Sequence, residues 1–122
     1  MKLGEFKPRP VKTQVSLDAL KVLDIRVGRI ILVEDLAGSD KLVRLTVDFG
    51  DHTRRIVSGI KAERANPSEV QGRQALFVVN LEPRRIRGEV SEGMLFDIGY
   101  EDGIPPALAV PERDVPNGAQ AG

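Results

Sequence analysis

The sequence contains no cysteine, no tryptophan and a single histidine, and its 18 basic and 18 acidic side chains cancel to zero net charge. The absence of cysteine excludes disulfides and thiolate metal sites, and it fits a reducing compartment such as the cytoplasm. Zero net charge removes the simplest argument for nucleic-acid binding, which is a strongly basic domain. No stretch approaches the roughly 20 apolar residues that span a bilayer, and the charged, proline-broken start does not resemble a signal peptide. We therefore expect a soluble, cytoplasmic protein in which any binding of anions depends on local charge.

Patterns for catalysis and metal binding are missing as well. The one histidine, His52, follows Gly50 and Asp51 in a predicted hairpin turn, and no nucleophile or carboxylate spacing points at it. The serines of Ser58-Gly59 and Ser91-Glu92-Gly93 lack the strand-to-helix setting of a nucleophile elbow. No zinc, calcium or phosphate-loop motif occurs. The sequence predicts a protein that is not an enzyme and holds no metal or cofactor.

Short apolar runs separated by turn residues predict an all-β domain. The first run is rich in β-branched residues, and Gly28 within it favours a bend or bulge. The second alternates between apolar and polar residues, which is typical of a half-buried strand. The fourth is apolar on both faces, so we expect a helix or another subunit to cover its outer face. The predicted strands are 24–33, 42–49, 53–60, 74–80 and one that begins at Met94.

One internal helix is predicted over 61–72, with Asn66 as its cap, Pro67 at the first helical position and Gly72 at its end. Three strands, a short helix and two more strands is the order of an OB-fold, a five-stranded Greek-key barrel with its helix between strands 3 and 4.

The pattern separates an N-terminal part from the barrel. Residues 1–21 form a basic arm and a short helix that begins after Ser16. The short helix is placed to cover one end of the barrel.

Binding of an anionic partner is better supported than catalysis. Arg84, Arg85 and Arg87 lie within four positions on the connection between two apolar runs, and Lys41 precedes the second strand. Such groups neutralise phosphates whatever the base sequence. From charge alone, a merely solvated surface is the alternative.

Aromatic residues narrow the choice of nucleic acid. OB-type binders of single strands stack bases on aromatic side chains. Here the pattern assigns Phe49 and Phe77 to the core, which leaves few platforms for stacking. Recognition of a folded RNA by its backbone and shape is the remaining mode.

Six motifs, in order, resemble those of the tRNA-binding domain found at the C-terminus of many bacterial methionyl-tRNA synthetases and in free-standing tRNA-binding proteins. The resemblance covers about residues 22–118, and it implies that these residues form the OB-fold domain and that residues 119–122 form a C-terminal tail. The motifs are Leu23-Asp24-Ile25-Arg26-Val27-Gly28-Arg29-Ile30, Ser39-Asp40-Lys41-Leu42, Ile56-Val57-Ser58-Gly59-Ile60, Val79-Asn80-Leu81-Glu82-Pro83, Arg87-Gly88 and Ser91-Glu92-Gly93-Met94.

This resemblance implies an OB-fold, a homodimer, and non-catalytic binding of tRNA at its L-shaped outer corner without strong preference among acceptors. Asn80 and Ser91 offer hydrogen bonds to sugar or phosphate, Gly93 permits close approach of the backbone, and Met94 offers a surface for a base or ribose. A turn-shaping role for Asn80 and a core position for Met94 are the alternatives. Arg84 and Arg85 of the basic cluster are added to the residues that the motifs indicate. The candidate RNA-binding residues are then Lys41, Ser58, Asn80, Arg84, Arg85, Arg87, Ser91, Gly93 and Met94.

Only about 20 residues precede the matched region, so the resemblance implies a free-standing module without a catalytic body, acting as an RNA chaperone or as an aid in trans to an aminoacyl-tRNA synthetase. The main alternative is a secretion-related chaperone of the same fold that binds unfolded polypeptide. A purely architectural partner of another protein is a third hypothesis. The Ser-Glu-Gly-Met and Arg87-Gly88 motifs favour tRNA. The expected dimer has its own basis in the doubly apolar fourth strand and in the apolar run 104–110.

Overall fold

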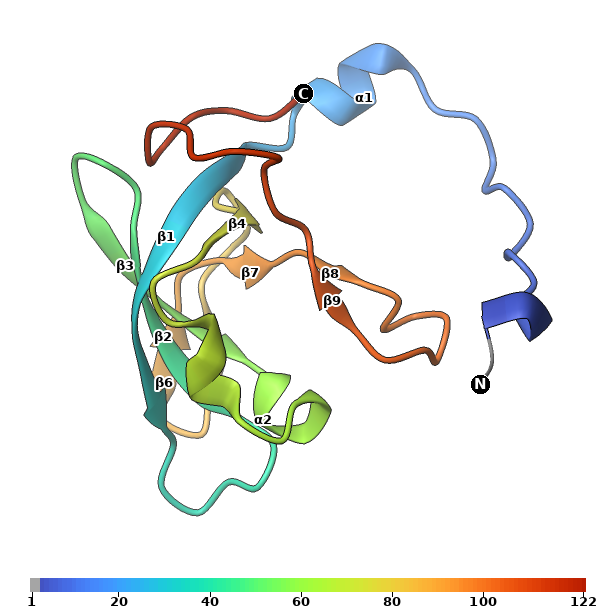
Figure 1. Ribbon diagram of the computed structural model, residues 1–122. Helices are drawn as coiled ribbons and strands as arrows, with labels where there is room; N and C mark the ends of the chain where they lie inside the picture. The colour runs from blue at the N-terminus through green and yellow to red at the C-terminus, as the bar shows by residue number, and fades with distance from the viewer. Residues whose placement is uncertain (1–2) are drawn as a thin grey trace.

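The computed structural model describes residues 3–122, and its centre is a curled antiparallel sheet of five strands in the order β3-β2-β1-β4-β7 (Figure 1). β7 also contacts β3, so the sheet curls back on itself as a small barrel. The predicted all-β OB-fold is confirmed. The strands are β1 (Ile25–Asp35), β2 (Val43–Asp48), β3 (Thr53–Ser58), β4 (Gln74–Val78), β5 (Arg84–Ile86), β6 (Glu89–Ser91), β7 (Met94–Leu95), β8 (Asp97–Ile98) and β9 (Ala107–Leu108).

The core lies inside the curled sheet and follows the predicted alternation. On β2, Val43, Leu45 and Val47 are completely buried, whereas the residues between them are half-buried. Phe49 continues this row and packs edge-on against Phe77 of β4, with ring centroids 5.6 Å apart. The assignment of both phenylalanines to the core is therefore confirmed.

The irregularity in β1 lies at a different residue from the one predicted. The register between β1 and β2 shifts between Ile30 and Leu32, so the extra residue is Ile31 rather than Gly28. Gly28 is needed for packing instead, because a Cβ added there would lie 2.4 Å from Val47 Cγ1 and 2.7 Å from Phe49 Cε1.

The predicted continuous helix over 61–72 is wrong. Two separate pieces occupy the region, α2 (Ile60–Glu63) and the 3₁₀ helix η2 (Pro67–Val70). Pro67 does begin η2, as its fixed φ favours, but the backbone of Arg64 is extended and interrupts any single helix. Buried Ile60 and Val70 anchor the two pieces to the core.

The chain's own C-terminal region lies against β4, beside one edge of the strand and, at Gln74, on its outer face. The backbone N–H of Leu76 donates to the carbonyl of Ala109, and the Gln74 amide bonds to Val115 and Asn117. Within the apolar run 104–110 Leu108 is buried, whereas Pro105, Ala107 and Val110 are exposed. The run therefore keeps exposed apolar surface, and the dimer stays a prediction.

The C-terminal residues continue along β1. The backbone of residues 118–121 hydrogen-bonds to Val27 and Ile25, on the side of β1 that β2 leaves open. These residues are therefore part of the barrel wall.

The N-terminal segment stands away from the barrel (Figure 1). It contains the 3₁₀ helix η1 (Leu3–Glu5) and the helix α1 (Leu17–Lys21), and Ser16 caps α1 by accepting a hydrogen bond from the N–H of Ala19, as predicted. α1 has no buried residue, so the expectation that it covers a barrel end is wrong. We call residues 3–24 the arm.

In the part of the chain that the structure describes, no helix has the length and apolar character needed to cross a membrane.

Candidate nucleic-acid interface

Three segments meet at one end of the barrel: the β1–β2 loop, the start of α2 and the tip of the β5–β6 hairpin. In the loop, Ser39 is buried and its Oγ accepts hydrogen bonds from the N–H groups of Lys41 (3.2 Å) and Leu42 (3.0 Å). From α2, Lys61 Nζ donates to the carbonyl of Ser39 (3.0 Å) and lies 3.3 Å from Asp35. These contacts fix the backbone beneath the exposed Lys41 side chain.

Arg87 and Gly88 form a two-residue turn between the paired residues Ile86 and Glu89. Both have positive φ, 49° and 81°, which is the conformation of a type I′ hairpin turn. For arginine this left-handed backbone costs about 1–2 kcal/mol. Arg87 Nη1 would lie 3.9 Å from a Cβ added at Gly38, so the hairpin tip leans towards the β1–β2 loop.

The hairpin is fastened to the outer surface of β2 and β3. Arg44 of β2 lies between Glu34 (3.1 Å) and Glu89 (2.6 Å), and the bond to Glu34 raises the pKa of Arg44. Ser91 is buried; its Oγ accepts from the N–H of Val57 (3.0 Å) and donates to the carbonyl of Gly93 (3.1 Å). Arg44 is not a candidate for phosphate binding, because its charge is already paired with the carboxylates of Glu34 and Glu89.

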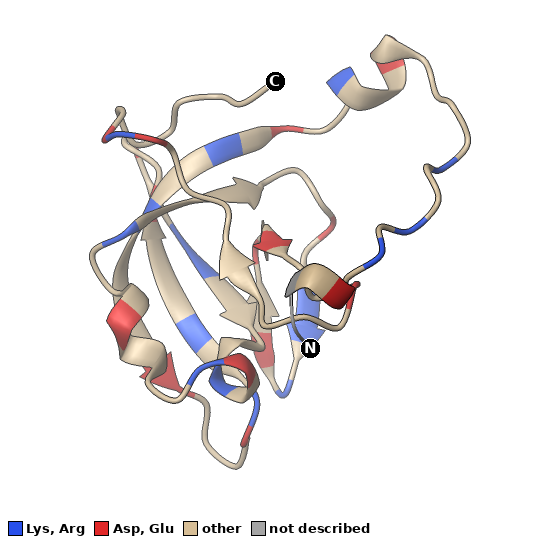
Figure 2. Ribbon diagram, turned by 45° about the vertical axis from the view of Figure 1, so that its right-hand side comes forward, with Lys and Arg blue, Asp and Glu red and all other residues tan. Residues whose placement is uncertain are grey.

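Four of the predicted residues present exposed cationic side chains: Lys41, Arg84, Arg85 and Arg87. Among residues 3–122, none of these four forms an ion pair within 4.0 Å. Elsewhere on the barrel, cationic and acidic residues are interleaved (Figure 2). The positive charge is thus local, as the balanced composition requires.

Two predicted residues have structural roles within the chain. The Asn80 side chain accepts from the N–H of Asp24 (2.8 Å) and donates to the carbonyl of Val22 (2.7 Å), which holds the arm where it enters β1. At Gly93, a Cβ would lie 3.0 Å from the carbonyl oxygen of Val78 and 3.2 Å from Ile56 Cδ1. Packing is therefore by itself a sufficient reason for glycine at this position.

The predicted residues divide between the two ends of the barrel. Ser58 is half-buried and pairs with Val43 beside the end of β1, at the same end as Lys41 and Arg87. Met94 pairs with Val78 beside the start of β1, at the other end with Asn80, and its side chain is 45% exposed. The structure therefore gathers only part of the predicted set.

Two cations hold the candidate surface in place, Arg54 and Lys61. From the sequence, Arg54 counts only as one of the local positive charges on strand 53–60, and Lys61 is not singled out. Arg54 binds the two ends of the segment that contains the hairpin. The alternation of side chains along β3 could have indicated the role of Arg54. It lies two residues before the core residue Ile56, so its side chain is on the same, inward-facing side of the strand. Lys61 carried no comparable signal.

One pair of carboxyl groups lies outside this surface. Partial burial, the hydrogen bond with Asp97 and the charge of Asp97 together raise the pKa of Glu63 to about 7. The pair connects α2 to β8. Within residues 3–122, no three histidine, aspartate or glutamate side chains gather as a metal site.

Comparison with known proteins gives consistent matches. The family model described as "Putative tRNA binding domain" matches residues 25–120. The chain is 38% identical over 117 residues to methionine–tRNA ligase of Bacteroides fragilis, covering 96% of this chain but only 17% of the ligase. The crystal structure of a MetRS-related protein from Pyrococcus horikoshii superposes with a TM-score of 0.83 at 34% identity, covering 91% of this chain and all of that chain. The chaperone CsaA of Bacillus anthracis gives a TM-score of 0.76 at 27% identity, with 90% and 100% coverage.

Proposed function

The chain belongs to the tRNA-binding domain family, and on this basis we propose that it binds tRNA as a non-catalytic, structure-selective module. The observation that carries the proposal is the pair Lys41 and Arg87, two exposed cations on fixed backbone at one end of the barrel. Arg84 and Arg85 extend the positive charge along β5. We call these four residues the basic surface.

The arrangement supports recognition of the RNA backbone rather than of bases. Phe49 and Phe77 are buried and unavailable for stacking. Lysine and arginine side chains bind phosphates and position a nucleic acid without reading its sequence. A rigid set of such groups discriminates between RNAs by the spacing of their phosphates, which favours folded tRNA over flexible RNA.

A salt titration tests this proposal. The affinity for mixed tRNA should fall steeply with salt, and each phosphate contact that is removed should lower the slope of log K against log salt by about 0.7–0.9. We expect that Lys41→Gln and Arg87→Asn each weaken binding several-fold. Asparagine is chosen at position 87 because it tolerates positive φ, so the turn is kept while the charge is lost.

The matched control is Arg113→Gln, which removes a charge already paired with Glu112 at 2.7 Å and should leave the affinity nearly unchanged. An unstructured RNA of equal length separates shape recognition from charge. Equal affinity for the two RNAs would contradict structure selectivity. Absent or salt-insensitive binding would refute the proposal as a whole.

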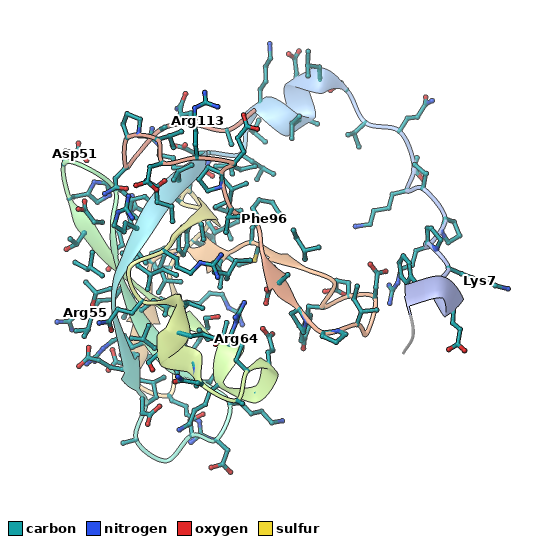
Figure 3. All side chains as sticks on the ribbon, viewed as in Figure 1. Lys7, Asp51, Arg55, Arg64, Phe96 and Arg113 are labelled. Atoms are coloured by element: carbon teal, nitrogen blue, oxygen red, sulfur yellow. The ribbon has the colours of Figure 1, made fainter. Side chains whose placement is uncertain are left out.

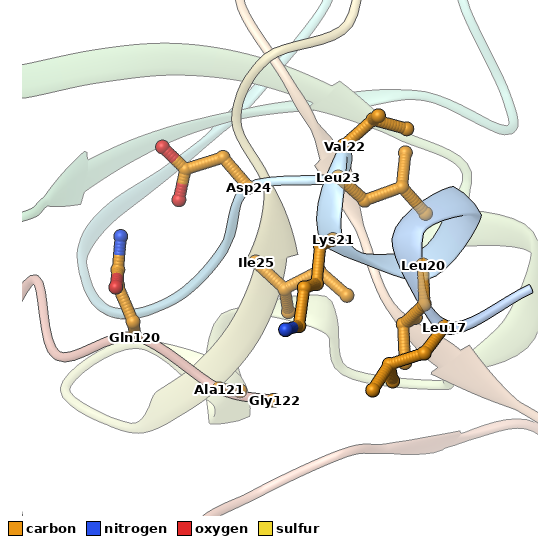
Figure 4. A pocket seen from close by; sticks show the side chains of 10 residues that line it. All are labelled: Leu17, Leu20, Lys21, Val22, Leu23, Asp24, Ile25, Gln120, Ala121 and Gly122. Atoms are coloured by element: carbon orange, nitrogen blue, oxygen red, sulfur yellow. The ribbon is translucent and has the colours of Figure 1, made fainter.

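We further propose that the chain acts as a homodimer joined through the arm. The arm carries exposed apolar side chains, with Val11 98% and Leu17 64% exposed. Together with the C-terminal residues, α1 borders an open groove of about 370 Å³ (Figure 4). Its lining is mainly apolar but includes two charged residues: Leu17, Leu20, Lys21, Val22, Leu23, Asp24, Ile25 and residues 120–122. A second copy would cover this surface by the same contacts in both directions.

Oligomeric state at micromolar concentration tests the dimer. The double change Leu17→Gln and Leu20→Gln should convert a dimer to a monomer in sedimentation velocity. The control is Ile31→Gln with Leu32→Gln, an exposed apolar pair on β1 outside the groove, which should leave the dimer intact. A wild-type monomer, or dissociation by both variants alike, would overturn this interface.

The similarity to CsaA, together with the apolar groove, supports one alternative function, the binding of unfolded polypeptide. In that case the wild-type chain would suppress aggregation of a denatured client protein, and the Leu17→Gln, Leu20→Gln variant would not. The charge variants Lys41→Gln and Arg87→Asn would have no effect on this activity. The tRNA proposal predicts the reverse dependence.

The chain covers 17% of the methionine–tRNA ligase to which it is similar. This similarity supports the narrower proposal that the module serves an aminoacyl-tRNA synthetase by holding its tRNA. Addition of the module in trans to a synthetase should then lower the KM for tRNA and leave kcat unchanged.

A further inference from the structure

The basic segment, residues 80–93, contains the β5–β6 hairpin and three of the four residues of the basic surface. The two ends of this segment are joined by one side chain of β3. Arg54 Nη1 donates to the carbonyl of Val79 at 2.6 Å and to the carbonyl of Glu92 at 3.1 Å. The guanidinium thus reinforces the base of the loop, where Val78 of β4 already pairs with Met94 of β7.

Arg54 and its neighbour Arg55 have opposite orientations. Arg54 pairs across the sheet with Val47, a completely buried residue, so its side chain has the phase of the core-facing row. Arg55 pairs with Thr46 and is exposed on the outside of the barrel (Figure 3). Arg55 meets the basic segment only through its backbone, since its N–H donates to Glu92 Oε1 (3.0 Å) and its carbonyl accepts from the N–H of Glu92 (2.9 Å). The two residues thus differ in that only the Arg54 side chain binds the ends of the segment.

The only histidine orients the Arg54 side chain. Arg54 Nε lies 3.0 Å from His52 Nε2, and His52 Nδ1 lies 2.6 Å from Asp51 Oδ1. Because Arg54 Nε carries a hydrogen, His52 Nε2 must accept, and the hydrogen bonds assign the proton of the neutral ring to Nδ1, which donates to Asp51.

The histidine is itself held by the core. Its ring stacks on Phe49, with centroids 5.7 Å apart and planes inclined by 25°, and Phe49 packs on Phe77. The contacts run from the barrel core through His52 and Arg54 to both ends of the basic segment. His52 is exposed, as expected for a turn residue, but it is also part of this chain of contacts.

We propose that Arg54, oriented by His52, is a positioning residue that presents the basic segment to RNA without contacting the RNA itself. The inference rests on the proposed tRNA binding. Its physical reason is that loop residues fixed before binding do not lose conformational freedom when RNA binds. Loss of the Arg54 contacts would loosen the base of the segment, which would then depend on the pairing of Val78 with Met94 and on the bonds to Glu89 and Ser91. The spacing of Arg84, Arg85 and Arg87 would be less tightly set.

The test compares Arg54→Gln with Arg55→Gln, since both remove one charge from the same strand. At a temperature where circular dichroism shows both variants folded, Arg54→Gln should weaken tRNA binding about tenfold and Arg55→Gln less than threefold. Arg54→Gln should also reduce the preference for tRNA over an unstructured RNA of equal length. His52→Ala, which removes no charge when the ring is neutral, should reduce the same preference and weaken binding about threefold.

Hydrogen exchange of the unbound chain provides a readout that global destabilisation would not mimic. Exchange should accelerate in residues 80–93 of the Arg54→Gln and His52→Ala variants, while β1, β2 and β4 keep their wild-type protection. In a double-mutant cycle, the effects of the two substitutions on affinity should be less than additive, because both break one chain of contacts.

Three outcomes would overturn the inference while leaving tRNA binding in place: equal loss of affinity in the two arginine variants, unchanged exchange in residues 80–93, or accelerated exchange spread over the whole barrel. If the wild-type chain bound no tRNA, the proposed function would fail first and this inference with it. Binding by the wild-type chain therefore distinguishes the two failures.

Discussion

The basic segment and the arm are both attached to the barrel, and both carry cationic residues, but the barrel holds them differently. β2 and β3 hold the basic segment at several points. Arg44 bonds to Glu89, Arg54 bonds to the carbonyl of Val79, and the backbone N–H of Val57 donates to Ser91. The arm is held near its two ends, by Arg9 at Glu101 and Asp102 and by Asn80 at the entry to β1. Between these points it exposes apolar side chains.

This difference relates the two segments to different partners. Exposed cations on a fixed backbone suit a ligand with regularly spaced phosphates, because little ordering is left for the binding step. Exposed apolar side chains on a weakly attached arm suit a second protein surface that removes them from water. The barrel is complete without the arm, whereas the arm lacks a covering surface of its own.

The largest effect that separates the two segments is expected from paired serine substitutions. Ser91→Ala leaves the buried N–H of Val57 without a partner and should lower the free energy of unfolding by about 1–3 kcal/mol. Ser16→Ala removes the cap of α1, a helix with no buried residue, so it should leave global unfolding unchanged. Urea denaturation followed by circular dichroism measures both. Equal effects would show that the arm is part of the cooperative barrel.

A smaller effect is expected from pH, and it should act on the barrel alone. The folded chain raises the pKa of Glu63 from 4.5 to about 7, so folding takes up a proton between these values. The stabilisation is present at pH 4–5 and is lost as pH rises through 7. Its size is about 1–2 kcal/mol once solvent screening at this partly exposed site is allowed for.

The substitution Glu63→Gln should remove this dependence and raise Tm at pH 8 relative to the wild type. The control Asp18→Asn changes an exposed carboxyl of the arm and should leave the pH profile as it is. A wild-type Tm that does not change between pH 5 and 8 would contradict the shared proton between α2 and β8.

The smallest effect is expected at the far attachment of the arm. The pair between Arg9 and Asp102 is largely exposed, with 67% and 31% of the two side chains accessible. Arg9→Ala should therefore change the free energy of unfolding by less than about 0.5 kcal/mol. It should, however, lower the backbone order parameters of residues 5–15 on the nanosecond timescale, with Lys12→Ala as the control. Unchanged order parameters would mean that other contacts hold the arm.

The sequence alone determined the features that depend on local periodicity. The alternation from Val43 to Phe49 predicted both the strand and its buried face, and Ser16 predicted the start of α1. Pro67 correctly marked a helical start, but the pattern joined α2 and η2 into one helix because nothing local shows that Arg64 is extended. The exposed cations Lys41 and Arg87 were likewise identified from motif and position.

Only the tertiary structure decided what each polar side chain of the candidate surface contacts. Asn80 bonds to residues 22–24 and Ser91 bonds to Val57, partners that are far away in the chain, so no pattern within a motif could show these contacts. Arg54 and Arg55 show the same limit most clearly. As neighbours with the same side chain they are equivalent by composition and charge, and the pleat of β3 places one against the ends of the basic segment and the other in solvent.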